Sequence, residues 1–234
     1  MSSTTLPRRG AQGGPPLLLP VLAYGALMVA AVIVSRNVPR LSAPAVTVLA
    51  YDRAHHTGLL AAGFLAFAAS VPLAVWTAAA YRRLRTLGIT APGTVIALAG
   101  GLLAAASLSL SGLVTWTSAQ AAASADPGLA KALADLTFAA GSAGFVAPLG
   151  LLLAGVAVPS LIVRLVPRPL AWAGLVVAAA AALSAFTLLT SALDFTLPAG
   201  RFLGLAWLIA MSVALPQQRR RAATAPVIRQ PSAA

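Results

Sequence analysis

Long apolar runs separated by short polar breaks dominate the hydrophobic pattern of this chain. Six runs reach or approach the roughly 20 helical residues that a bilayer core requires. They predict spans near residues 17–34, 57–80, 92–116, 135–160, 169–191 and 198–215. The pattern therefore predicts an all-α fold, a polytopic membrane bundle of six transmembrane helices.

The two ends of the chain differ from these runs. Residues 1–14 and 217–234 are rich in small, polar and basic residues and have little to bury. We expect both to be disordered basic tails. The first apolar run is longer than the apolar core of a signal peptide and lacks a cleavage pattern, so we expect it to be retained. Residues 15–216 then form one integral membrane domain.

Composition supports a membrane protein and excludes several kinds of chemistry. Hydrophobic residues make up 59% and charged residues 9% of the chain, whereas soluble domains are about 25% charged. The absence of cysteine excludes disulfides, thiolate metal sites and cysteine nucleophiles. The net charge of +12 comes from arginines in the breaks between apolar runs. That placement indicates orientation in a bilayer and not nucleic-acid binding.

The basic residues predict which side of the membrane each break faces. If the breaks alternate, eleven of the sixteen Lys and Arg residues fall on one side and five on the other. The richer side is expected to be cytoplasmic, which places both termini inside. All four aspartates and both histidines then fall on the outer side. No ionisable group lies at the predicted midplane of a span, which argues against a proton-coupled transporter.

One short stretch, AYDRAHHTG at 50–58, gathers most of the chemically useful side chains. On a helix continuous into the second span, Asp52 would lie one turn from His55 and His56. Asp135 or Asp194 could then complete a metal site. The favoured interpretation is an interfacial entry segment with a solvated Asp52 and Arg53. Asp194 is also near enough in sequence to pair with Arg201 across a turn. No phosphate loop, metalloprotease motif or nucleophile elbow occurs, so no catalytic residue or cofactor is predicted.

The second half of the chain resembles a known bacterial family. The residues that carry the resemblance are LGLLLAGVAVPSLIVRLVPRPLAWAGLVVA at 149–178, with the loop PRPLAWAGL at 167–175, and RFLGLAWLIAM at 201–211. YRRLRTLG at 81–88 is similar as well. Together they resemble the multi-pass family called domain of unknown function 4386. The resemblance implies six spans in a bacterial, actinobacterial-type plasma membrane, and it implies no catalytic residue.

Three functional hypotheses remain open. The first is a non-enzymatic protein that binds a partner or senses the envelope. The second is a small transporter or carrier of an apolar solute, which needs a cavity between helices. The third is an outer-face enzyme or metal binder, which needs Asp52, His55 or His56 to meet Asp135 or Asp194.

The expected partners follow from the same pattern. The lipid bilayer is the principal partner, and no nucleic acid is expected. Arg219, Arg220 and Arg221 anchor the topology or contact anionic lipid. Small residues recur every four positions in the third run, which favours close packing within the bundle and leaves a homo-oligomer or protein partner open. This stripe comprises Gly93, Ala97, Gly101, Ala105 and Ser109.

Overall fold

The computed structural model describes residues 16–35, 38–39 and 41–216. All regular secondary structure in this part of the chain is helical, so the all-α prediction is confirmed. The expected tails at 1–14 and 217–234, with Arg219, Arg220 and Arg221, lie outside the described residues. The α-helices are α1 (Leu18–Val34), α2 (Ala45–Ala54), α3 (His56–Thr86), α4 (Gly93–Ala121), α5 (Pro127–Gly141), α6 (Ala143–Ile162), α7 (Arg168–Leu183), α8 (Thr196–Pro198) and α9 (Gly204–Ala214).

Five helical segments are long and apolar enough to cross a membrane. They are α3, α4, the broken helix α5–α6, α7 with the 3₁₀ turn Ser184–Leu188, and the run from α8 through α9. The first predicted span is present as α1, an apolar helix of 17 residues that is shorter than these five. The chain is therefore a multi-pass helical membrane protein.

The surface of the bundle is apolar and part of its interior is polar. Large apolar side chains such as Leu189, Ile162 and Val213 are 83%, 73% and 72% exposed. Several serines and threonines are buried instead, among them Ser70, Thr94 and Ser160. Water would penalise such a surface, whereas lipid tails solvate it, so the outward faces of the helices contact the bilayer.

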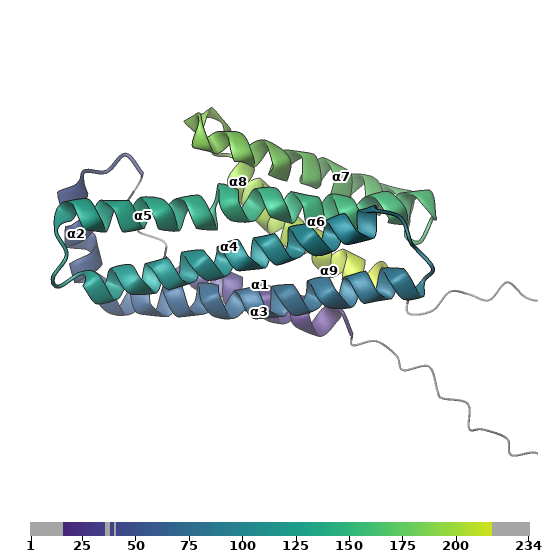
Figure 1. The fold of residues 1–234 in the computed structure, drawn as a ribbon, viewed down its shortest axis with the longest axis horizontal. Helices are drawn as coiled ribbons and strands as arrows, with labels where there is room; N and C mark the ends of the chain where they lie inside the picture. The colour runs from purple at the N-terminus through teal and green to yellow at the C-terminus, as the bar shows by residue number, and fades with distance from the viewer. Residues whose placement is uncertain (1–15, 36–37, 40, 217–234) are drawn as a thin grey trace, which may run out of the picture.

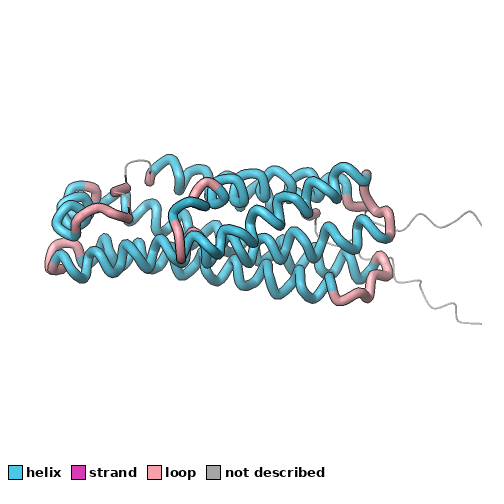
Figure 2. Tube along the Cα trace, turned by 90° about the horizontal axis from the view of Figure 1, so that it is seen from above, coloured by secondary structure: helices cyan, strands magenta, loops and turns pink. Residues whose placement is uncertain are grey.

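The long helices lie side by side along one axis, with α2 at one end of the bundle (Figures 1 and 2). Glycines allow them to approach closely. A Cβ atom at Gly112 of α4 would lie 2.5 Å from the Phe67 nitrogen and 2.7 Å from the Gly63 oxygen of α3. At the other end of α4, a Cβ at Gly155 of α6 would meet the Gly93 oxygen at 2.6 Å. Part of the small-residue stripe therefore packs inside the bundle.

The fourth predicted span differs from its expected form. The helix begins at Pro127, not near residue 135, and the Asp126 carboxylate caps it by accepting the Leu129 amide at 2.8 Å. Its interruption lies at Ser142, where φ is −100° and ψ is −97°. Pro148 lies six residues beyond this break, inside α6. The break divides the segment into α5 and α6.

The last span is irregular at its beginning. α8 is followed by a π-helical turn, Ala199–Leu203, and then by α9. Arg201 lies within this turn and so belongs to the helical segment Thr196–Ala214. Trp76 is fully buried and donates a 2.8 Å hydrogen bond to the Ser212 hydroxyl. It joins α3 to α9.

Candidate binding cavity

The AYDRAHHTG stretch forms a corner between two helices. α2 ends at Ala54, His55 has φ −118° and ψ 27°, and α3 begins at His56. The single continuous helix on which Asp52, His55 and His56 would share a face is therefore wrong. The corner brings the end of α2 against the end of α4.

Asp52 is buried, so the expectation that it is solvated is wrong, whereas Arg53 is exposed as expected but also hydrogen-bonded to the protein. Asp52 is only 5% exposed, and its carboxylate accepts a 2.9 Å hydrogen bond from the Ser118 hydroxyl of α4. Arg53 donates from Nε to the Ala122 carbonyl at 2.9 Å and from Nη2 to the Ala125 carbonyl at 3.4 Å. Asp52 therefore joins α2 to α4, and Arg53 joins α2 to the turn between α4 and α5.

The electrostatic consequence of this burial falls on Asp52. Removal from water disfavours the charged carboxylate and raises its pKa, and the hydrogen bond from Ser118 offsets the rise only in part. Burial also raises the pKa of the neighbouring Tyr51, and the Asp52 charge adds to that rise. A buried carboxylate with one hydroxyl donor is thus held close to a cavity that it lines.

The two histidines take no part in a common site with the aspartates. His55 and His56 are exposed, and the His55 ring stacks on Tyr51 with 4.2 Å between centroids. Its Nδ1 atom lies 3.1 Å from the Tyr51 carbonyl oxygen. Asp194 is exposed as well. Across residues 16–35, 38–39 and 41–216, no three His, Cys, Asp or Glu side chains lie close enough together to hold a metal ion.

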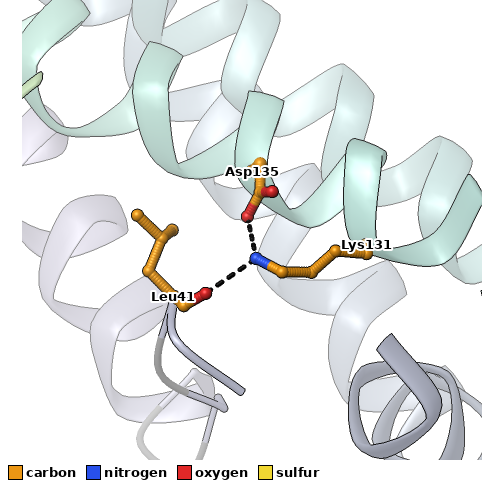
Figure 3. A network of polar contacts seen from close by, with 3 residues as sticks. All are labelled: Leu41, Lys131 and Asp135. Atoms are coloured by element: carbon orange, nitrogen blue, oxygen red, sulfur yellow. Dashed lines mark hydrogen bonds and ion pairs between the residues drawn. The ribbon is translucent and has the colours of Figure 1, made fainter. Parts of the chain in front are cut away.

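Asp135 forms an ion pair on its own helix. Lys131 and Asp135, one turn apart on α5, are joined directly, although this is the less favourable order for such a pair (Figure 3). The Lys131 ammonium also donates to the Leu41 carbonyl at 2.7 Å. Lys131 therefore attaches the segment before α2 to α5 and leaves Asp135 neutralised.

A cavity of about 670 Å³ lies between the helices at this half of the bundle. Its walls are mainly apolar and come from α1, the segment after it, α2, α3, α4, α5 and the beginning of the last span. Asp52 and the Lys131–Asp135 pair line one region, and Arg201 lines another. The apolar walls include Met28, Val32, Leu59, Ala62, Ala66, Leu108, Ala134, Phe138 and Phe202.

Arg201 faces the bundle and does not pair with Asp194. Its Nη2 atom donates to the Gly141 carbonyl, and the guanidinium lies 5.4 Å from the centre of the Phe145 ring. The Nε atom is buried and has no hydrogen-bond partner among the described residues. Among the described residues Lys131–Asp135 is the one ion pair, and Arg201 takes no part in it. Sequence reasoning assigned Arg201 to an outer break, although its place within the apolar run 198–215 was a signal of burial.

Comparisons with known proteins identify no family for this chain. No protein-family model matches the chain, and no curated protein or solved structure is similar to it. The resemblance to domain of unknown function 4386 therefore gains no support.

Proposed function

We propose that this chain is a six-span, non-enzymatic protein of the cell membrane that binds a mainly apolar small molecule within its bundle. The observation that carries the proposal is the cavity of about 670 Å³. Ligand sites usually have volumes of about 300–1,000 Å³, apolar walls and a few polar groups. Among the three hypotheses, the carrier of an apolar solute is the one that needs such a cavity.

The asymmetry of basic residues supports an orientation for this cavity. α3 ends in Arg82, Arg83 and Arg85, and α7 begins at Arg168, at the end of the bundle away from α2. By the positive-inside rule that end faces the cytoplasm. The cavity, lined by α2 and by the first turns of α3 and α5, then opens in the outer half of the membrane. The ligand would enter from the outer leaflet or the outer medium.

Two features distinguish this proposal from its rivals. The histidines are exposed and form no metal-binding group with Asp52 and Asp135, so the described residues offer no support for an outer-face metal enzyme. Partner binding and homo-oligomers stay predictions, since no described surface identifies a partner. The irregular helices beside the cavity, broken at Ser142 and at the π-helical turn, are a frequent property of membrane binding sites.

Binding of a fluorescent apolar probe tests the proposal. The purified full chain in lipid nanodiscs should bind N-phenyl-1-naphthylamine saturably, above the partition measured in protein-free nanodiscs. Ala66→Phe adds a ring to the cavity wall and should weaken or abolish that binding. Ala61→Phe, on the exposed face of the same helix, is the matched control and should leave it unchanged. Absence of saturable binding, or equal effects of both variants, would overturn the proposal.

A further inference from the structure

Arg201 is a partly buried cation that forms no ion pair with any described residue. Each aspartate is engaged elsewhere or lies apart. Asp52 accepts from Ser118, Asp135 pairs with Lys131, Asp126 caps α5, and Asp194 is exposed without an ion pair among the described residues. An isolated charge away from water is unfavourable, and an ionisable residue inside a membrane bundle usually marks a ligand or ion site.

The hydrogen bonds of Arg201 are also incomplete. A guanidinium has five N–H groups, and the described residues provide one acceptor, the Gly141 carbonyl. In a regular helix the Phe145 amide would donate to the Gly141 carbonyl. At the break it donates instead to the Ser142 carbonyl at 3.1 Å, which leaves the Gly141 carbonyl accessible. The Phe145 ring covers one side of the guanidinium at 5.4 Å. Arg201 Nε has no partner, and the nearby Tyr24 hydroxyl is buried without one as well.

The remaining charged groups of the cavity lie at a different level. Gly141, which binds Arg201, is ten residues beyond Lys131 on α5, or about 15 Å along the helix axis. Between these levels the wall is uncharged. Ala134 and Phe138 contribute apolar groups, and Ser111 and Thr137 contribute hydroxyls. Among the described residues, the titratable groups that line the cavity are Asp52, Lys131, Asp135 and Arg201. Among the described residues, an uncharged middle thus separates the region of Asp52 and the Lys131–Asp135 pair from Arg201, a cation without an ion pair.

We infer that the ligand is an anionic amphiphile, whose single anionic head group binds Arg201 while its apolar body fills the cavity. A carboxylate or phosphate would accept the unused N–H groups of Arg201 and compensate its charge. A free inorganic anion would leave the apolar walls unfilled. The inference rests on the proposed function, because it names the chemical class of ligand for the same cavity.

Competition between two ligands that differ only in their head groups tests this inference. Oleate and oleyl alcohol would each compete with N-phenyl-1-naphthylamine on the full chain in nanodiscs. Wild-type protein should bind oleate about tenfold or more tightly than oleyl alcohol, as expected for a desolvated charge-assisted pair. Sodium acetate at a large excess should not displace the probe, because it lacks an apolar body.

Two variants test whether the preference for oleate over oleyl alcohol depends on Arg201. Arg201→Gln should remove the preference, so that oleate and oleyl alcohol bind with equal affinity. Arg168→Gln removes an equal charge from an exposed position at the other end of the bundle and should change neither. If Arg201→Gln does not fold, the comparison of oleate with oleyl alcohol on the wild-type protein still tests the inference.

The outcomes separate the two proposals. Equal binding of oleate and oleyl alcohol by the wild type, with the probe bound saturably, overturns the anionic head group and leaves the cavity site intact. Displacement by acetate alone also overturns it, in favour of a free-anion site. Failure of the probe and of both lipids to bind overturns the ligand-binding function itself.

Discussion

The Ser118 hydroxyl donates a 2.9 Å hydrogen bond to the Asp52 carboxylate, and the two residues are 66 positions apart in the chain. Both side chains are buried, at 7% and 5% exposure. This bond holds α2 against the end of α4 and places a carboxylate in the wall of the cavity. The stability of the outer end of the bundle should therefore depend on both partners.

Removal of the donor should destabilise the protein. Ser118→Ala leaves a buried carboxylate without its hydroxyl partner, which we expect to lower the free energy of unfolding by about 1–3 kcal/mol. Ser124→Ala removes a hydroxyl from an exposed position and should have little effect. Thermal unfolding of the detergent-solubilised proteins at pH 7 measures both. Equal melting temperatures for Ser118→Ala and wild type would contradict a structural role for this bond.

The pH dependence of stability should reveal the same carboxylate. Burial raises the pKa of Asp52 in the folded protein, whereas an unfolded aspartate has a pKa of about 3.9. The folded state then binds the proton more tightly than the unfolded state. This contribution to stability is full below the unfolded pKa and is lost as pH rises through the raised folded pKa. Asp52→Asn cannot titrate, so its stability should fall less over that window.

Unfolding temperatures measured from about pH 4 to pH 8 test this sign, with the window set by the reference pKa of aspartate. The wild type should lose stability with rising pH relative to Asp52→Asn. The exposed Asp194→Asn serves as the control and should follow the wild type. Parallel curves for wild type and Asp52→Asn would show that Asp52 titrates as it does in the unfolded chain.

The elements that the sequence predicted well are those specified by local pattern. The apolar runs predicted the first residues of α3, α4 and α7 to within one position, because about 20 apolar residues in succession favour a membrane helix wherever they occur. The features that sequence reasoning missed depend on distant residues. Arg201 and Gly141 are 60 positions apart, and no local pattern reports that the break at Ser142 presents a carbonyl to that arginine. Basic residues were interpreted as topology markers, which concealed the inward position of Arg201.

Close glycine packing gives a prediction with a matched control. A Cβ at Gly112 would lie 2.5 Å from the Phe67 nitrogen and so would force α3 and α4 apart. We expect Gly112→Ala to destabilise the bundle by about 1–3 kcal/mol. Gly58→Ala, whose Cβ would meet only Val34 Cγ1 at 3.9 Å, should be neutral or slightly stabilising. Thermal unfolding compares the two, and equal destabilisation would show that the helices do not approach at Gly112.

Zinc should not stabilise the protein through its histidines. His55 and His56 are exposed and do not meet two further ligands among the described residues. The double variant His55→Ala with His56→Ala should change the free energy of unfolding by about 1 kcal/mol or less. Melting temperatures of wild type and variant, with and without zinc chloride, provide the measurement. Stabilisation by zinc that occurs in the wild type and disappears in the variant would restore the metal-site hypothesis.

Accessibility of single cysteines tests the proposed orientation. The chain has no native cysteine, so each introduced thiol is the sole target of a maleimide. Ser124 lies after α4 and Thr86 at the end of α3, and both are exposed in the structure, so burial cannot explain a difference between them. The positive-inside rule places Thr86, beside Arg82, Arg83 and Arg85, in the cytoplasm. In intact cells a membrane-impermeant maleimide should therefore label Ser124→Cys and not Thr86→Cys, whereas permeabilised cells should show labelling of both. The reverse pattern in intact cells would place the cavity in the cytoplasmic half of the membrane, because α2 and the cavity lie at the Ser124 end of the bundle.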